Sequence, residues 1–192
     1  MRLFVALVPP PAVLAGLDAA IAPHRAGRAP GRDLRWTGPP DWHLTLAFLG
    51  EVPGPAAARL GSRLERAAGR HPPFPLALAG AGAFPGPSHA RVLWCGLAGD
   101  LPALEALAAS VADAATNAGA APPDAGRPFR PHLTLARART PADVRDLVAT
   151  LCPYAGPPWR VDRAELIASH LGGQPRYTTV SAWPLNGDTL NR

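Results

Sequence analysis

The segment His43–Gly50 reads HLTLAFLG, and the segment His132–Ala138 reads HLTLARA. The same four residues open both segments, and 132 − 43 = 89 residues separate the two copies. On a strand, side chains two residues apart share a face, so each copy directs its His and Thr one way and its two leucines the other. The leucine face, which Phe48 extends in the first copy, belongs in a core. The His/Thr face is then left to line something polar.

Elements of the same kind follow one another in the same order around both copies, after a first strand at Arg2–Val8. The order is helix, loop, HLTL strand, helix, strand, turn and strand. A capping-box-like pair, Thr140 and Asp143, starts the helix of the second half that follows HLTL. This parallel indicates an internal duplication within residues 1–192, whose two motifs we expect to face each other across a shared cleft. The expected ranges are Pro11–Ala22, Pro23–Arg35, His43–Leu49, Pro55–Ala68, Phe74–Ala83 and Arg91–Leu97, and then Leu101–Ala118, Gly119–Phe129, His132–Arg137, Thr140–Thr150, Trp159–Ser169 and Arg176–Trp183.

Two imidazoles and two hydroxyls around one cleft match the needs of phosphodiester cleavage. One neutral His can take a proton from water, the other can protonate the leaving oxygen, and each Thr hydroxyl can donate a hydrogen bond to a phosphate oxygen. An ordinary His pKa near 6.5 allows both forms near neutral pH. A single His-x-Thr is a weak signal, but two copies with the same flanks favour function. A two-His zinc site with Asp41 is the weaker alternative, and no metal is expected.

The charge of the chain narrows the possible mechanisms. The net charge is +5, and all 19 positive side chains are Arg, because the chain contains no Lys. A Walker A loop and an ATP-dependent nucleotidyl-transferring ligase both require a Lys, so both are excluded. Arginine can bind a phosphate through two parallel N–H donors. Arginines on solvated helix faces also explain a positive net charge of this size.

The cysteines and the apolar segments indicate the compartment in which we expect the protein. Cys95 and Cys152 lack the spacing of metal ligands, and Cys95 lies in an apolar run typical of a buried position. Two cysteines form no disulfide framework, which favours a reducing compartment. The apolar run at the N-terminus is too short for a signal peptide, and no stretch reaches membrane-span length. We therefore expect a cytoplasmic protein with no membrane partner.

The motifs and their flanks resemble the 2H phosphoesterase superfamily, which is named for two His-x-Thr-x motifs. More closely, the chain is similar to the bacterial and archaeal RNA 2′,3′-cyclic phosphodiesterases, also called 2′-5′ RNA ligases. The resemblance covers nearly the whole chain and rests on the stretches RLFVALVPP, RWTGPPDWHLTLAFLGEV, FPGPSHARVLW, RPFRPHLTLAR and LGGQPRYTTVSAWPL.

The resemblance implies a fold, a reaction and the roles of four residues. The fold is a bilobal α+β domain with antiparallel sheets flanked by helices and two pseudo-two-fold-related lobes around a basic cleft. The reaction is hydrolysis of an RNA 2′,3′-cyclic phosphate to a 2′-phosphate without metal, cofactor or ATP, and some members also join RNA ends through a 2′-5′ bond. By matching position, His43 is the proton donor and His132 the proton acceptor, while Thr45 and Thr134 bind the phosphate. Spacing and composition do not reveal which His has which role.

Arg137 matches the Arg of the family's HxTxxR pattern, which implies a substrate contact. Strict alternation puts it on the face opposite His132, so either the strand ends or bends there, or Arg137 forms a structural salt bridge. We favour substrate binding, because the equivalent residue of the first copy is Phe48, a core-type side chain.

Other residues give weaker signals. Base or ribose contacts are expected from a set of aromatic and basic residues beside the motifs, although such aromatics are more often core or cleft wall. This set is Trp42, Phe129, Arg130 and Tyr177. The remaining histidines are expected at the surface, with His170, beside a Gly-rich turn, the candidate for access to the cleft. They are His24, His71, His89 and His170.

The expected function is a metal-independent RNA 2′,3′-cyclic phosphodiesterase. It would act as a monomer on RNA ends or nucleotides that bear a 2′,3′-cyclic phosphate. Two alternatives stay open: a module that binds a nucleotide without turnover, and a superfamily enzyme that acts on a small substrate such as a cyclic phosphate of ADP-ribose or trims RNA 3′ ends. Two titrating imidazoles argue against pure binding.

Overall fold

The computed structural model describes residues 2–26, 33–123, 126–170, 172 and 175–186. Within these residues the protein is a mixed α+β fold, and its strands form one curled sheet. The elements in chain order are β1 (Arg2–Leu7), α1 (Pro11–Ala26), β2 (Leu34–Trp36), η1 (Pro39–Asp41), β3 (Leu44–Glu51), α2 (Gly54–Gly69), β4 (Phe74–Phe84), η2 (Pro87–His89), β5 (Ala90–Gly99), α3 (Leu101–Ala118), β6 (Leu133–Ala142), α4 (Arg145–Leu151), β7 (Trp159–Val161), β8 (Arg163–Ser169) and β9 (Tyr177–Pro184).

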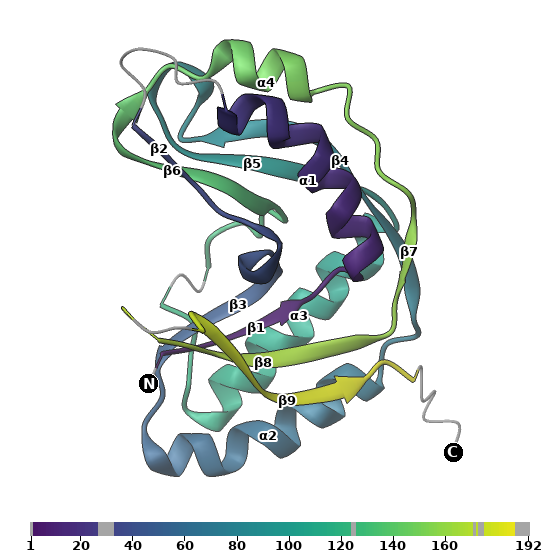
Figure 1. Ribbon diagram of the computed structural model, residues 1–192. Coiled ribbons are helices and arrows are strands. Elements are labelled where there is room, and N and C mark those ends of the chain that lie inside the picture. The colour runs from purple at the N-terminus through teal and green to yellow at the C-terminus, as the bar shows by residue number, and fades with distance from the viewer. Residues whose placement is uncertain (1, 27–32, 124–125, 171, 173–174, 187–192) are drawn as a thin grey trace.

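The sheet divides into two lobes that meet at the two HLTL strands (Figure 1). The strand order is β7-β4-β5-β6-β3-β1-β8-β9, with β2 paired to β6, and all pairings are antiparallel. At the centre, Leu44 of β3 pairs with Leu133 of β6. The expected bilobal α+β fold with antiparallel sheets is therefore confirmed.

Two helices lie over each lobe (Figure 1), and their buried residues belong to the same apolar core as those of the strands. The lower lobe of Figure 1 contains β3, β1, β8 and β9. In this lobe, α2 and α3 pack on each other and against β9 and β3. The upper lobe contains β7, β4, β5, β6 and β2. In this lobe, α4 contacts β4, while α1 contacts the η1 turn. Both HLTL leucine pairs belong to this core, as expected from their spacing, because Leu44, Leu46, Leu133 and Leu135 are all 5% exposed or less.

Each lobe contains strands from both halves of the sequence. The hairpin β4–β5 follows β3 and α2 of the lower lobe in the chain, yet it pairs with β6 of the upper lobe. Conversely, the hairpin β8–β9 follows β6 and α4 of the upper lobe and pairs with β1 of the lower lobe. The two lobes are thus held together by crossed chain segments as well as by the central strand contact. The internal duplication itself stays a hypothesis.

Most expected elements are confirmed, but three expectations were wrong. The expected loop Pro23–Arg35 contains the end of α1 and the start of β2, while residues 27–32 lie outside the described part. The helix expected from Thr140 begins at Arg145, because β6 continues to Ala142 and the Asp143 carboxylate accepts the backbone N–H of Arg145. The single strand expected over Trp159–Ser169 is two strands, with a break at Asp162, whose carbonyl accepts the N–H of Leu185.

The described helices include none that is long and apolar enough to cross a membrane. Cys95 is 1% exposed, which confirms the expectation of a buried small residue, and burial raises the pKa of its thiol to about 12.

The indole of Trp94 lies on the sheet over a glycine. Trp94 on β5 pairs with Gly82 on β4, and a Cβ at Gly82 would overlap the indole ring. We expect Gly82→Ala to displace Trp94 and to lower the free energy of unfolding by about 1–3 kcal/mol, the usual cost of overpacking. Urea unfolding measures this difference.

Gly86→Ala is the matched control for that substitution. Gly86 has extended backbone and no atom within 4 Å of a Cβ placed there, so we expect stability close to that of the unaltered protein. Equal stability of the two variants would contradict the packing role assigned to Gly82.

Candidate active site

A β-bulge in β6 brings Arg137 to the face of the sheet that carries Thr134. Thr134 pairs with Trp94 and Arg137 pairs with Val92, so the ladder skips Leu135. Cross-strand partners share a face, and Trp94 and Val92 are two residues apart on β5. Thr134 and Arg137 therefore share a face although they are three residues apart. The bulge adds one residue to β6 and bends the strand, which is one of the alternatives that the sequence left open for Arg137.

The same bulge occurs in β3 and corrects the expectation for Phe48. Thr45 pairs with Ala6 and Phe48 pairs with Phe4, while a register shift leaves Leu46 unpaired. Thr45 and Phe48 therefore share a face, and Phe48 is 38% exposed rather than part of the core. Simple alternation failed here because it assumes an unbroken period of two.

Both copies of the motif meet in one small pocket of about 80 Å³. If the register at Leu44 and Leu133 continues by one residue each way, each His stands opposite the Thr of the other copy. The pocket brings together all five residues expected to act on the phosphate and one of the candidate base contacts. Its lining residues are Thr37, Asp41, His43, Thr45, His132, Thr134, Arg137, Arg176 and Tyr177.

The His43 ring is packed against two aromatic side chains of the lower lobe. Its centroid lies 4.6 Å from that of Phe4 and 5.0 Å from that of Tyr177, which stands edge-on to it. This burial lowers the pKa of His43 to about 4, and a backbone hydrogen bond with Asp41 opposes the shift. His43 is therefore neutral in the free protein at pH 7.

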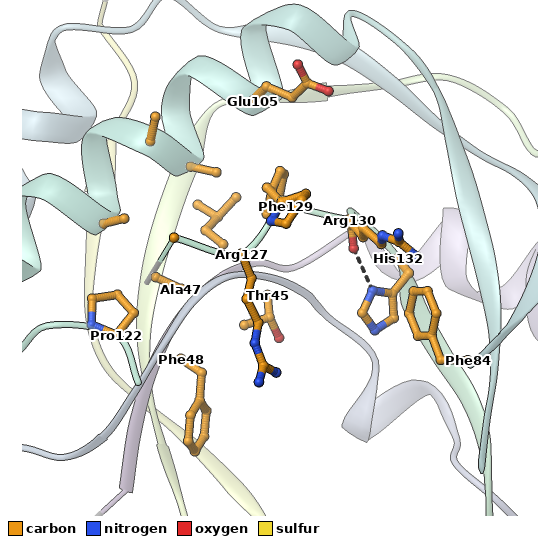
Figure 2. A pocket seen from close by; sticks show the side chains of 16 residues that line it. Thr45, Ala47, Phe48, Phe84, Glu105, Pro122, Arg127, Phe129, Arg130 and His132 are labelled. Carbon is orange, nitrogen blue, oxygen red and sulfur yellow. Dashed lines mark hydrogen bonds between the residues drawn. The ribbon is translucent and has the colours of Figure 1, made fainter. Parts of the chain in front are cut away.

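The His132 ring has a matching environment in the upper lobe (Figure 2). Its centroid lies 4.9 Å from that of Phe84, which stands edge-on to it. Its Nδ1 lies 2.7 Å from the carbonyl oxygen of Arg130. A carbonyl can only accept, so Nδ1 carries a proton, and the Nε2 of the neutral ring is a free acceptor. Burial also lowers the pKa of His132, and the Arg130 carbonyl opposes the shift.

Two guanidinium groups give the small pocket its charge. The bulge in β6 brings Arg137 into the pocket, and Arg176 is the residue immediately before β9. Both guanidinium groups lower the pKa of His43. The Nη1 atom of Arg176 lies 3.8 Å from the Asp41 carboxylate, and its guanidinium lies 5.4 Å from the centroid of the Tyr177 ring. Arg176 was not expected as a site residue from the sequence, although its neighbour Tyr177 was a candidate.

Thr37, also missed from the sequence, fixes the segment before the first motif onto the second motif. Its hydroxyl lies 2.7 Å from the carbonyl oxygen of Thr134 and 3.0 Å from that of Leu135. The indole N–H of Trp42 donates to the same hydroxyl at 3.0 Å. These bonds attach the residues before β3 to β6.

Trp42 is a core residue, which corrects its candidacy as a base or ribose contact. Its side chain is 2% exposed, and its indole N–H is already bonded to Thr37. The guanidinium of Arg25 lies over its ring, donates to the carbonyl of Thr37 and pairs with Asp18. The Trp42 ring thus packs in the core, and its contact with Arg25 joins α1 to the cleft.

A larger pocket of about 620 Å³ adjoins the small one and shares Thr45 and His132 with it. It lies between β3, α3 and the segment before β6, and Figure 2 shows Phe48, Phe129 and Arg130 around it. Two of the base-contact candidates, Phe129 and Arg130, therefore line the cleft, and the third, Tyr177, lines the small pocket.

The other histidines lie outside both pockets. His170 is exposed and bonds to the Thr178 hydroxyl at 3.2 Å, and His89 is exposed beside Ser88. His24 and His71 are only half-exposed, and His71 bonds to Ser110. In the described part of the chain, no three His, Cys, Asp or Glu side chains form a group that could hold a metal ion.

The lowered pKa of His43 predicts a loss of stability in acid. Between about pH 6.5 and pH 4 the unfolded chain binds a proton at His43 and the folded chain does not, so the free energy of unfolding falls as the pH falls. The difference reaches about 3 kcal/mol below pH 4. We expect His43→Gln to lose less stability than the unaltered protein over this range, as measured by urea unfolding. The control is His89→Gln at an exposed His, and an identical pH dependence in all three proteins would contradict the burial argument.

Comparison with known proteins gives a consistent set of relatives. The family model described as the 2′-5′ RNA ligase superfamily matches residues 10–173. A Thermus thermophilus protein named RNA 2′,3′-cyclic phosphodiesterase is 35% identical over 195 residues, which cover 98% of this chain and 92% of that protein. A Geobacillus stearothermophilus protein of the same name is 34% identical over 79% of this chain, which spans about half of that relative (48%). The chain covers 61% of an Aeropyrum pernix protein of that name, at 39% identity.

Solved structures agree with these relatives. The crystal structure of Escherichia coli LigT complexed with 3′-AMP has a TM-score of 0.71 at 29% identity, covering 96% of each chain. TT0787 of Thermus thermophilus has a TM-score of 0.70 at 31% identity, covering 98% of this chain and 100% of that chain. The match in sequence and in fold extends over nearly the whole chain, and the chain therefore belongs to the 2′-5′ RNA ligase superfamily.

Proposed function

We propose that the protein is an RNA 2′,3′-cyclic phosphodiesterase that hydrolyses a terminal cyclic phosphate to a 2′-phosphate by two-His general acid/base catalysis. The observation that carries this proposal is the meeting of both His-Thr pairs with Arg137 and Arg176 in one pocket of about 80 Å³. Two imidazoles, two hydroxyls and two guanidinium groups are what an in-line attack on a phosphodiester needs. Relatives named RNA 2′,3′-cyclic phosphodiesterase support the same reaction.

In the proposed reaction, His132 is the base and His43 is the acid. His132 Nε2 takes a proton from water, and the water oxygen bonds to phosphorus. The bond from phosphorus to the 3′ oxygen breaks, and His43 gives its proton to that oxygen. Thr45 and Thr134 donate to the non-bridging oxygens, and Arg137 and Arg176 offset the negative charge. The product is a 2′-phosphate beside a free 3′-hydroxyl.

The donor role of His43 depends on the charge of the substrate. Burial lowers the pKa of both rings, that of His43 to about 4, so His43 is neutral at pH 7 in the free protein. A phosphodiester anion beside the ring favours imidazolium and raises the pKa of His43 in the complex. We propose His43 as donor because its position matches the family's first motif.

The larger pocket is proposed to hold the nucleoside. It adjoins the phosphate pocket at Thr45 and His132, and its size lies within the usual range for ligand sites. Phe48 and Phe129 offer apolar surface to a base, and Arg130 offers a cation at the rim. LigT complexed with 3′-AMP supports a nucleotide ligand for this fold.

The finer parts of the proposal concern assembly and the reverse reaction. Both motifs come from one chain, so we propose a monomeric, bilobal domain that arose by duplication and needs no second subunit, metal or ATP. Ligation through a 2′-5′ bond would use the same displacement, in which a 5′-hydroxyl replaces water as the nucleophile and the bond from phosphorus to the 3′ oxygen breaks. The pure binding module and the small cyclic-phosphate substrate remain the alternatives that the following experiment separates.

The first test is turnover of an RNA oligonucleotide that ends in a 2′,3′-cyclic phosphate, in excess EDTA. We expect a 2′-phosphate product, and a loss of about 100- to 10,000-fold in kcat for His43→Ala and for His132→Ala. Chromatography against 2′- and 3′-phosphate standards identifies the product. The control variant is His170→Ala, which alters an exposed His outside both pockets.

Three results would count against the proposal. No turnover with RNA or with a cyclic mononucleotide would leave a binding module. Loss of turnover only with EDTA would indicate a metal site. A 3′-phosphate product would reverse the bond that breaks.

A second test assigns the two histidines. A substrate with sulfur in place of the 3′ oxygen has a thiolate leaving group that needs no proton. We expect this substrate to restore His43→Ala to within about 10-fold of the unaltered protein and to leave His132→Ala slow, because only the acid becomes dispensable. Single-turnover rates measure the restoration. Restoration of His132→Ala instead would exchange the two roles.

A further inference from the structure

We infer that three arginines of β2 and β6, here called the arginine ladder, bind the backbone phosphates of the RNA upstream of the reacting end. The ladder consists of Arg35, Arg137 and Arg139. It extends the phosphate pocket along the upper lobe and makes the protein prefer an RNA chain over a cyclic mononucleotide. This inference rests on the proposed function, because Arg137 belongs to both sites.

The pairing of β2 with β6 sets the direction of the ladder. Arg35 pairs with Arg137, so the two share a face of the sheet. Their neighbours on these strands, Leu34 and Ala138, pair with each other and pack against the core. Arg139 lies two residues beyond Arg137 on β6 and is exposed, past the last pair of β2 with β6 and within the stretch where β6 shifts its register against β5. Arg35 and Arg137 therefore face away from the upper-lobe core, toward the side of the sheet that carries the small pocket, and Arg139 continues the row along β6.

The ladder has exposed charge without ion pairing in the described structure. Arg35, Arg137 and Arg139 are all exposed, and none of them has a carboxylate within ion-pair distance among the described residues. By contrast, Arg25, Arg145, Arg163 and Arg176 each contact an Asp. Asp33 immediately precedes β2 and is exposed, and no ion pair joins it to the ladder among the described residues. The three guanidinium groups are thus available to an external anion.

The spacing of the ladder suits a chain of phosphates. Residues two apart on a strand rise by about 7 Å, so Arg137 and Arg139 present successive cations along β6, with Arg35 beside the first. Arginine can bind a phosphate through two parallel N–H donors, and a row of arginines matches a chain that carries one negative charge per nucleotide. The row begins inside the pocket proposed for the terminal phosphate, so the same RNA strand can occupy both sites (Figure 1, β2 and β6).

The test compares kcat/KM for three substrates: a nucleoside 2′,3′-cyclic phosphate, a dinucleotide and a ten-nucleotide RNA, the latter two ending in a cyclic phosphate. For Arg139→Ala we expect about a fivefold loss on the longer substrates at about 0.1 M salt, and about 25-fold for Arg35→Ala/Arg139→Ala. The mononucleotide should be unaffected within about twofold. Each removed Arg should reduce the slope of log(kcat/KM) against log[salt] by about 0.7.

Two further variants control for sign and position. Asp33→Asn removes the exposed carboxylate next to the ladder and should raise the preference for the ten-nucleotide RNA. Arg66→Ala removes an exposed Arg from α2, away from the ladder strands, and should leave all three substrates unchanged.

The outcomes separate this inference from the proposed function. Turnover of all three substrates, with the same ratio between them in the double variant as in the unaltered protein, overturns the ladder and leaves the function intact. A loss in Arg66→Ala as large as in Arg139→Ala also overturns the ladder, since it would show a general charge effect. No turnover of any substrate by the unaltered protein overturns the proposed function, and the inference falls with it.

Discussion

The antiparallel contact between Leu44 and Leu133 is the constraint on which the whole cleft depends. It joins the two half-sheets into one and fixes the relative position of the two HLTL strands. Because the pairing is antiparallel, the residues that flank the two leucines run in opposite order along the two strands, and the His and Thr of both strands line the small pocket. The core supplies the energy for this arrangement, since both leucines are 1% exposed or less. The polar face is thus positioned by the apolar one.

The bulges at Leu46 and Leu135 make two similar strands suitable for one asymmetric ligand. Each bulge turns the residue three positions after the Thr onto the cleft face. In one strand that residue is Phe48, which lines the larger pocket, and in the other it is Arg137, which lines the small one. Without the bulges both side chains would point toward the core. An apolar surface and a cation therefore stand at equivalent positions, and the cleft gains a direction that the HLTL motifs alone do not give.

The sequence predicted the elements well and the exact faces less well. Strand and helix ranges came from hydrophobic periodicity, which is strong for long segments such as α3. The positions of Phe48 and Arg137 needed the bulges, which depend on the partner strand and leave no mark in a period-of-two pattern. The sequence did not predict the burial of Trp42. Its indole contacts Arg25, which is distant in the sequence, and Thr37, which belongs to no recognised motif. Arg176 and Thr37 enter the pocket through loops that only the assembled sheet brings together.

The electrostatics of the pocket favour an anion and oppose a proton. Burial against Phe4 and Tyr177 lowers the pKa of His43 to about 4, and Arg137 and Arg176 lower it further. The free pocket therefore keeps His43 neutral at neutral pH, and the same arginines favour an anionic ligand. Under the proposed mechanism, the bound anion offsets the repulsion between the guanidinium groups and an imidazolium, so that His43 takes up its proton as the substrate binds. Under the proposed mechanism, the burial that lowers the pKa of His43 in the free protein is opposed in the complex by the charge of the bound phosphate, so the ring holds the proton of the proposed acid only while the phosphate is present.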